Sequence, residues 1–109
     1  DVYKRQVNDA ALARRLKASW SDMMGRETVI SEPPTGMGGE DFPYFTLDPE
    51  IPAVYWQVGG TPPEAIERAA EGGAPVPSHH SPQFRIAPEP SVTAGVESTV
   101  RALFELMAP

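Results

Sequence analysis

Apolar side chains recur at nearly four-residue spacing in the first quarter of the chain, with basic residues between them. This period places them on one face of a helix. Asn8 or Asp9 can cap its first turn, and Gly25 can end it in a left-handed conformation. The pattern predicts one amphipathic helix between these residues. Its apolar face consists of Leu12, Leu16, Trp20 and then Met23 and Met24.

A second stripe with helical spacing begins at Ser91 and continues to the end of the chain. Charged residues, Glu97, Arg101 and Glu105, occupy the other side of the same segment. This arrangement predicts a second long amphipathic helix. The stripe is formed by Val92, Val96, Val100, Leu103, Phe104 and Met107.

Two segments between these helices favour extended structure. Residues 27–32, ETVISE, end at two prolines that cannot continue a ladder, and residues 53–58 are a nearly continuous apolar run of strand-favouring residues. Pro43 favours a brief helix between them, and PPEAIERAA favours a turn or two of helix in the otherwise loop-rich stretch 61–81. The order predicts an α/β fold in which a partial sheet with flanking helices forms one side of a larger sheet.

Composition narrows the classes of partner. The chain of 109 residues has a formal net charge of −6, which offers no electrostatic attraction to nucleic acid or anionic lipid. No apolar run approaches the length of a membrane span. The absence of cysteine excludes disulfides and thiolate ligands within the chain and fits a reducing compartment. We therefore expect a cytoplasmic protein that binds neither nucleic acid nor membrane.

The first six residues, DVYKRQ, are expected to be foreign to the protein. They lack the features of a start or a signal peptide. They closely resemble the translation of a transposon end that serves as an adapter in sequencing libraries. An ordinary polar N-terminus or an expression remnant is the alternative. Residues 7–109 are then expected to be a segment of a longer protein.

The only two histidines, His79 and His80, are adjacent in the loop PSHHSPQF. A catalytic zinc or manganese site needs about three protein ligands and an open position for water. If the local backbone is extended, neighbouring side chains point to opposite sides, and at most one of the two imidazoles binds a given ion. Histidines without any ligand are the alternative. The sequence thus predicts at most one direct metal ligand, with the site completed by residues outside the segment.

The glycine-rich segment GMGGEDF is a second candidate site. Gly38 and Gly39 allow backbone amides to approach a ligand closely, and the start of a following helix favours an anion such as a substrate carboxylate. Glu40 and Asp41 are also what a plain helix N-terminus would select. Taken alone, the segment favours the capping interpretation.

The combination of MGGEDFPYF, PSHHSPQF and the final EPSVTAGVESTVRAL resembles the C-terminal part of the M20 family of metallopeptidases. The similarity is to its amidohydrolase branch, which includes hippurate hydrolase and related N-acyl-amino-acid amidohydrolases, and it extends over residues 7–109. The resemblance implies part of an α/β catalytic domain that binds two divalent metal ions, such as zinc or manganese. It also implies a small-molecule amide substrate and a full-length relative that forms a homodimer.

The resemblance also implies roles for individual residues. His80 matches the family's last metal ligand, whereas His79 stands where another residue type is usual and is expected only to line the site. The pocket is expected to include Gly38, Gly39, Glu40 and Asp41, with Gly39 replacing the serine of the family's motif. The remaining ligands, and the glutamate that deprotonates the metal-bound water, are absent from the chain. The segment alone is therefore expected to be inactive.

A second function stays open on the sequence alone. The chain could be a stand-alone, non-catalytic module that binds a small molecule or a partner. Its binding surface would then be the glycine-rich loop with aromatic residues Tyr44, Phe45, Tyr55 and Trp56. A cooperatively folding monomer without an exposed apolar strand edge would favour this alternative.

Overall fold

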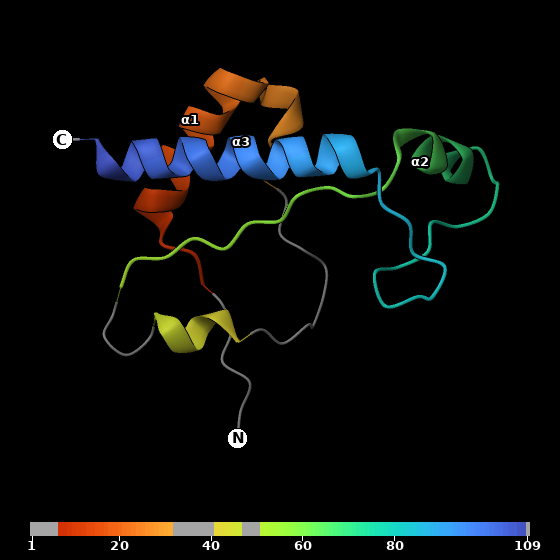
Figure 1. Cartoon of the computed structure of the whole chain (residues 1–109), viewed down its shortest axis with the longest axis horizontal. Coiled ribbons are helices and arrows are strands. Elements are labelled where there is room, and N and C mark those ends of the chain that lie inside the picture. The colour runs from red at the N-terminus through yellow and green to blue at the C-terminus, as the bar shows by residue number, and fades with distance from the viewer. Residues whose placement is uncertain (1–6, 32–40, 47–50, 109) are drawn as a thin grey trace. The chain divides into compact units, whose positions relative to one another are not determined.

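The computed structural model describes residues 7–31, 41–46 and 51–108, and every regular element in these ranges is helical (Figure 1). The chain divides into two compact units, one joining residues 1–56 to 100–109 and the other formed by residues 57–99. None of the helices in the described ranges could cross a membrane, being too short or too polar. The elements are α1 (Ala10–Met24), η1 (Arg26–Thr28), η2 (Phe42–Phe45), α2 (Pro63–Ala70) and α3 (Pro88–Met107), where η denotes a 3₁₀ helix.

Helix α1 begins and ends at the residues that the sequence indicates. Asp9 is its N-cap, and one carboxylate oxygen of Asp9 accepts a hydrogen bond of 2.8 Å from the backbone N–H of Leu12. Gly25 ends the helix with a φ of 92°, a backbone conformation that favours glycine. Its N–H donates to the Ser21 carbonyl. The predicted first helix is confirmed.

The core of the first unit forms on the predicted face of α1. Leu16 and Trp20 are buried there together with Ala102 of α3. The Trp20 ring also contacts Trp56, with ring centroids 5.2 Å apart. Met24 packs at the edge of this cluster, whereas Met23 is exposed. The other partly buried apolar residues against the core are Leu12, Val29 and Val54.

Helix α3 is confirmed, although it begins at Pro88 rather than at Ser91. Two prolines occupy its first turn, where a missing N–H costs no intrahelical hydrogen bond. Its buried residues are the small Ser98 and Ala102. The apolar stripe that a surface helix usually packs against its core is exposed here. The exposed side chains of the stripe are Val92, Val96, Val100, Leu103, Phe104 and Met107.

The predicted α/β fold with a partial sheet is wrong, since the described residues contain no strand. The first predicted strand, 27–32, overlaps η1 instead. Thr28 folds back onto the end of α1, because its hydroxyl donates to the carbonyls of Met24 and Gly25 at 2.9 and 2.7 Å. These local hydrogen bonds compete with a strand ladder for the same backbone. Glu32 lies outside the described residues.

The second predicted strand, 53–58, also forms no ladder. The side-chain amide of Asn8 accepts a 2.8 Å hydrogen bond from the N–H of Tyr55 and donates a 2.9 Å bond to its carbonyl. The N–H of Asp9 donates to the Ala53 carbonyl at 2.8 Å. One side chain thus satisfies the two backbone groups that a neighbouring strand would pair. Strand-favouring residues alone do not make a sheet when such contacts are available.

The two short helices predicted at Pro43 and in PPEAIERAA are confirmed as η2 and α2. Each has a proline in its first turn. The polypeptide after α2 turns sharply, because the Gly73 N–H donates to the Arg68 carbonyl at 2.9 Å. A Cβ atom at Gly73 would lie 2.6 Å from that carbonyl oxygen. This close approach requires glycine.

Two hydrogen bonds connect the start of α3 to the segment before α2. The Ala87 N–H donates to the Gly60 carbonyl at 2.8 Å, and the Ser91 hydroxyl donates to the Gly59 carbonyl at 3.1 Å. The loop between α2 and α3, which carries both histidines, therefore starts and returns within the second unit.

Candidate functional site

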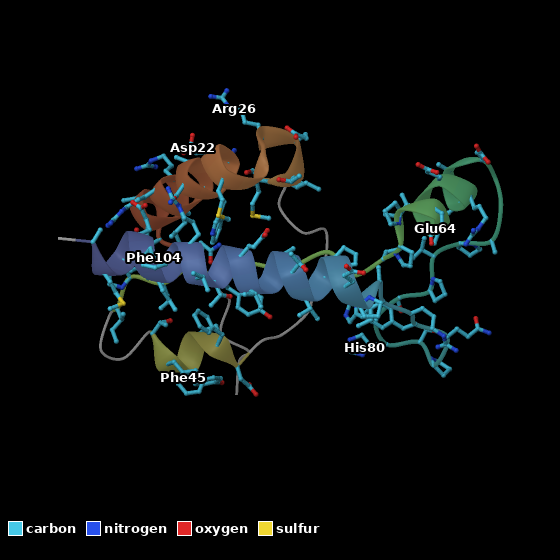
Figure 2. All side chains as sticks on the ribbon, turned by 45° about the horizontal axis from the view of Figure 1, so that its top comes forward. Asp22, Arg26, Phe45, Glu64, His80 and Phe104 are labelled. Carbon is cyan, nitrogen blue, oxygen red and sulfur yellow. The ribbon has the colours of Figure 1, made fainter. Side chains whose placement is uncertain are left out.

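The two histidines lie on a loop that local hydrogen bonds hold in shape, and Figure 2 shows His80 on this loop between α2 and α3. The Ser81 N–H donates to the Ser78 carbonyl at 2.9 Å, and its carbonyl accepts from the Phe84 N–H at 3.0 Å. The Ser81 hydroxyl accepts a further 3.1 Å bond from the Gln83 N–H. Ser81 therefore organises the turns that follow the histidines. Both imidazoles remain exposed.

The imidazole rings of His79 and His80 lie against each other. Their centroids are 4.3 Å apart, and their planes are inclined by 52°. The backbone turns at these two residues instead of remaining extended. The condition under which neighbouring side chains would point to opposite sides is not met, so the two rings occupy the same side of the loop.

The glycine-rich candidate site is described only in part. Gly38, Gly39 and Glu40 lie outside the described residues. Asp41 is exposed and precedes η2, where its backbone carbonyl accepts a 3.0 Å bond from the Tyr44 N–H. Its carboxylate does not cap the helix. Asp41 thus takes the N-cap position of η2 through its main chain.

The sequence predicts at most one direct metal ligand in this chain, and the family resemblance assigns that role to His80. Within the described ranges, no three His, Cys, Asp or Glu side chains form a group that could hold an ion. His80 has one imidazole neighbour, His79. Imidazole is a common ligand of zinc and of related transition metals, so the donor chemistry of this pair fits such an ion.

The structure also contains a polar cluster between α1 and α3 that the sequence analysis missed. We call it the Ser19 cluster. The buried Ser19 hydroxyl donates to a Glu105 carboxylate oxygen at 3.1 Å and accepts from the Arg101 Nε at 2.6 Å. Arg15 binds the other Glu105 carboxylate oxygen through its Nε at 2.8 Å and donates to the Glu105 carbonyl as well. The available signal was spacing: Arg15 and Ser19, like Arg101 and Glu105, are four residues apart and share a helix face.

The Ser19 cluster makes the stability of the first unit depend on pH. The Arg15 hydrogen bond, followed by that of the Ser19 hydroxyl, holds the pKa of Glu105 below its ordinary value of 4.5. A lowered pKa means that the folded state prefers the carboxylate more strongly than the unfolded state does. The resulting stabilisation is fully present above the ordinary pKa and is lost as pH falls through the folded pKa.

We therefore expect thermal unfolding of the wild-type chain to shift to lower temperature on acidification through this window. In Glu105→Gln that shift should be smaller, because the titrating group is gone. The measurement is the midpoint of unfolding by circular dichroism at a series of acidic pH values. Glu97→Gln, which removes an exposed carboxylate from the same helix, is the matched control and should retain the wild-type slope. Equal slopes for wild type and Glu105→Gln would contradict the assignment.

The histidine pair and the Ser19 cluster differ in how accessible their side chains are. In the Ser19 cluster the central hydroxyl is buried and already bonded on both sides. In the histidine pair both side chains are exposed, and the pair is therefore the candidate site. Comparison of the chain with family models, with curated proteins and with solved structures finds no match.

Proposed function

We propose that this chain contributes to a metal-dependent amidohydrolase that cleaves the amide bond of N-acyl amino acids or similar small amides. His80 is a metal ligand in this proposal, and the pocket is lined by His79 and by the segment from Gly38 to Asp41. The supporting observation is the exposed imidazole of His80 on a loop held by Ser81, at the position where the family resemblance implies a ligand. The proposed metal is zinc, manganese or a similar ion, and the proposed compartment is the cytoplasm.

The metal ions, His80 and the turns at Ser81 have different roles in the proposed reaction. Two bound divalent ions would supply Lewis-acid chemistry, polarising the amide carbonyl and making water a stronger nucleophile. His80 contributes an imidazole nitrogen to one ion, and the turns at Ser81 keep the histidine loop in shape around it. The other donors, and the carboxylate that takes the proton from water, belong to residues outside these 109. The chain supplies one part of the centre.

The proposal is tested on the product of the whole gene that encodes this chain. We expect the purified protein, loaded with Zn²⁺ or Mn²⁺, to hydrolyse at least one member of a panel of N-acyl amino acids. His80→Ala should reduce kcat/KM by more than the roughly 10–100-fold that loss of an outer-shell partner costs a metal site. The 109-residue chain alone should give no turnover with the same substrates and ions.

The matched control is Gln83→Ala, which changes an exposed side chain three residues from His80 and leaves both imidazoles in place. It should retain the wild-type rate. Three results would contradict the proposal. The gene product could hydrolyse none of the panel, His80→Ala could be fully active, or the isolated 109-residue chain could turn over substrate.

A second candidate function is a non-catalytic module that binds a small molecule or a partner. The observation that favours it is the number of large apolar side chains left exposed, including the aromatic Tyr55 and Trp56. A gene product without hydrolytic activity, together with a cooperatively unfolding monomer of the 109-residue chain, would favour this function. Hydrolysis that depends on His80 would exclude it as the main role.

A further inference from the structure

The contact between the two imidazoles needs an explanation beyond the role of His80. The rings are only 4.3 Å apart between centroids, and both side chains are exposed. The turn at residues 79 and 80 brings the rings to one side of the loop. The hydrogen bonds of Ser81 hold the segment that follows.

Two imidazoles that bind one ion must lie close together on the same side of the backbone, as these two rings do. Each ligating nitrogen lies about 2.0–2.1 Å from a zinc ion, which brings the two rings close together. Adjacent histidines on an extended backbone cannot meet this requirement, because their side chains diverge. Exposed side chains change rotamer readily on the picosecond-to-nanosecond timescale. Rotation of these exposed side chains is the movement that would direct one nitrogen of each ring toward a common ion.

We propose that His79 and His80 bind one divalent transition-metal ion together, as a two-imidazole chelate. The proposal rests on the proposed function for the role of His80 and adds His79 as a second donor to the same ion. Imidazole suits zinc, copper and nickel, whereas calcium and magnesium prefer oxygen ligands. Water molecules complete the coordination.

An ion held by two imidazoles of the same chain binds with higher affinity than an ion held by one. Once one imidazole holds the ion, the second binds within the same molecule, at an effective concentration in the millimolar range or above. The two histidines then contribute as a unit, and removal of either one forfeits the gain. A site built on His80 alone would not respond to a change at His79.

The test is titration calorimetry of the full 109-residue chain with Ni²⁺ in a metal-free buffer. We expect one ion per chain, and a loss of affinity of about tenfold or more in both His79→Ala and His80→Ala, as expected when an intramolecular second contact is removed. The double variant, with both His79→Ala and His80→Ala, should show no specific binding of Ni²⁺. Gln83→Ala, exposed on the same loop, should bind as the wild type does. Circular dichroism checks that each variant keeps its helices.

A spectroscopic readout counts the ligands directly. With Cu²⁺ in place of Ni²⁺, electron paramagnetic resonance should show nitrogen splitting from two imidazoles in the wild type and from one in each single variant. Weaker binding in His80→Ala with unchanged binding and spectrum in His79→Ala would overturn the pair while leaving the proposed function standing. Wild-type affinity in both single variants would overturn the pair and the role of His80 together.

Discussion

Leu16→Ala is expected to lower the free energy of unfolding by about 2–5 kcal/mol, the range typical of a buried leucine replaced by alanine. The Leu16 side chain is only 2% exposed and lies at the centre of the core of the first unit, with Trp20 and Ala102. Folded domains retain about 5–15 kcal/mol in total, so this one change removes a large share of the margin. Urea unfolding followed by circular dichroism and tryptophan fluorescence measures it.

The chain contains a matched control for this change. Leu103 of α3 is 51% exposed, and Leu103→Ala removes the same atoms from the surface. We expect its effect to stay within about 0.5 kcal/mol, as for surface substitutions in general. Equal losses at the two positions would show that the first unit is not packed around Leu16.

Ser19→Ala is the second substitution with a large expected effect, a loss of about 1–3 kcal/mol in the free energy of unfolding. The buried hydroxyl of Ser19 accepts from Arg101 and donates to Glu105, so its removal leaves two charged groups short of a hydrogen bond. Hydrogen bonds to charged groups contribute more to stability than those between neutral groups. Urea unfolding again gives the value.

Two further variants separate the Ser19 cluster from a general effect of the substitution. Ser21→Ala, on the same helix but less buried, should change stability little. Ser19→Ala combined with Glu105→Gln should lose less than the sum of the single losses, because the two side chains share a hydrogen bond. Strict additivity would indicate that the two residues do not interact in solution.

Local signals in the sequence were sufficient for the helices. Asp9 caps α1 through its own carboxylate, and Gly25 ends it with a positive φ, so both boundaries are set by residues within one turn of the helix end. The apolar face of α1 could also be predicted, because Leu16 and Trp20 share it and both are buried. These features depend on neighbours a few positions away.

Local sequence signals could not show whether residues 53–58 would pair in a sheet. Residues 53–58 have the composition of a buried strand, yet the backbone of Tyr55 pairs with the side chain of Asn8, 47 positions earlier. Composition indicates that a segment can form a strand but does not say which groups will meet its hydrogen-bonding edges. That outcome depends on tertiary contacts, and no local pattern near Tyr55 indicates it.

The faces of α3 show a second limit. Its apolar stripe predicted a helix correctly, but the residue of α3 that is buried in the core is the small Ala102. Small residues let two helices approach closely, and the hydrogen bonds of Ser19 with Arg101 and Glu105 add polar contacts there. Judged by hydrophobicity alone, the apolar stripe would be the buried face of α3 and the face that carries Ala102 would be exposed.

The sequence could single out the histidine pair but could not predict the geometry of its rings. The sequence singled out His79 and His80 because the chain has no other histidine. Whether their rings diverge or meet depends on the backbone angles of two loop residues, and the turn there brings them together. The other predicted pocket residues, from Gly38 to Glu40, lie outside the described part of the chain.

The Ser19 cluster joins residues that are translated 90 positions apart. Arg15 binds Glu105 across 90 positions, and the core beneath it needs Ala102. At about 5–20 residues per second, a ribosome takes several seconds to travel that distance. Throughout that interval Leu16 and Trp20 of the nascent polypeptide have no α3 to cover them. The apolar face of α1 is therefore exposed during synthesis until Ala102 and its neighbours in α3 have been added.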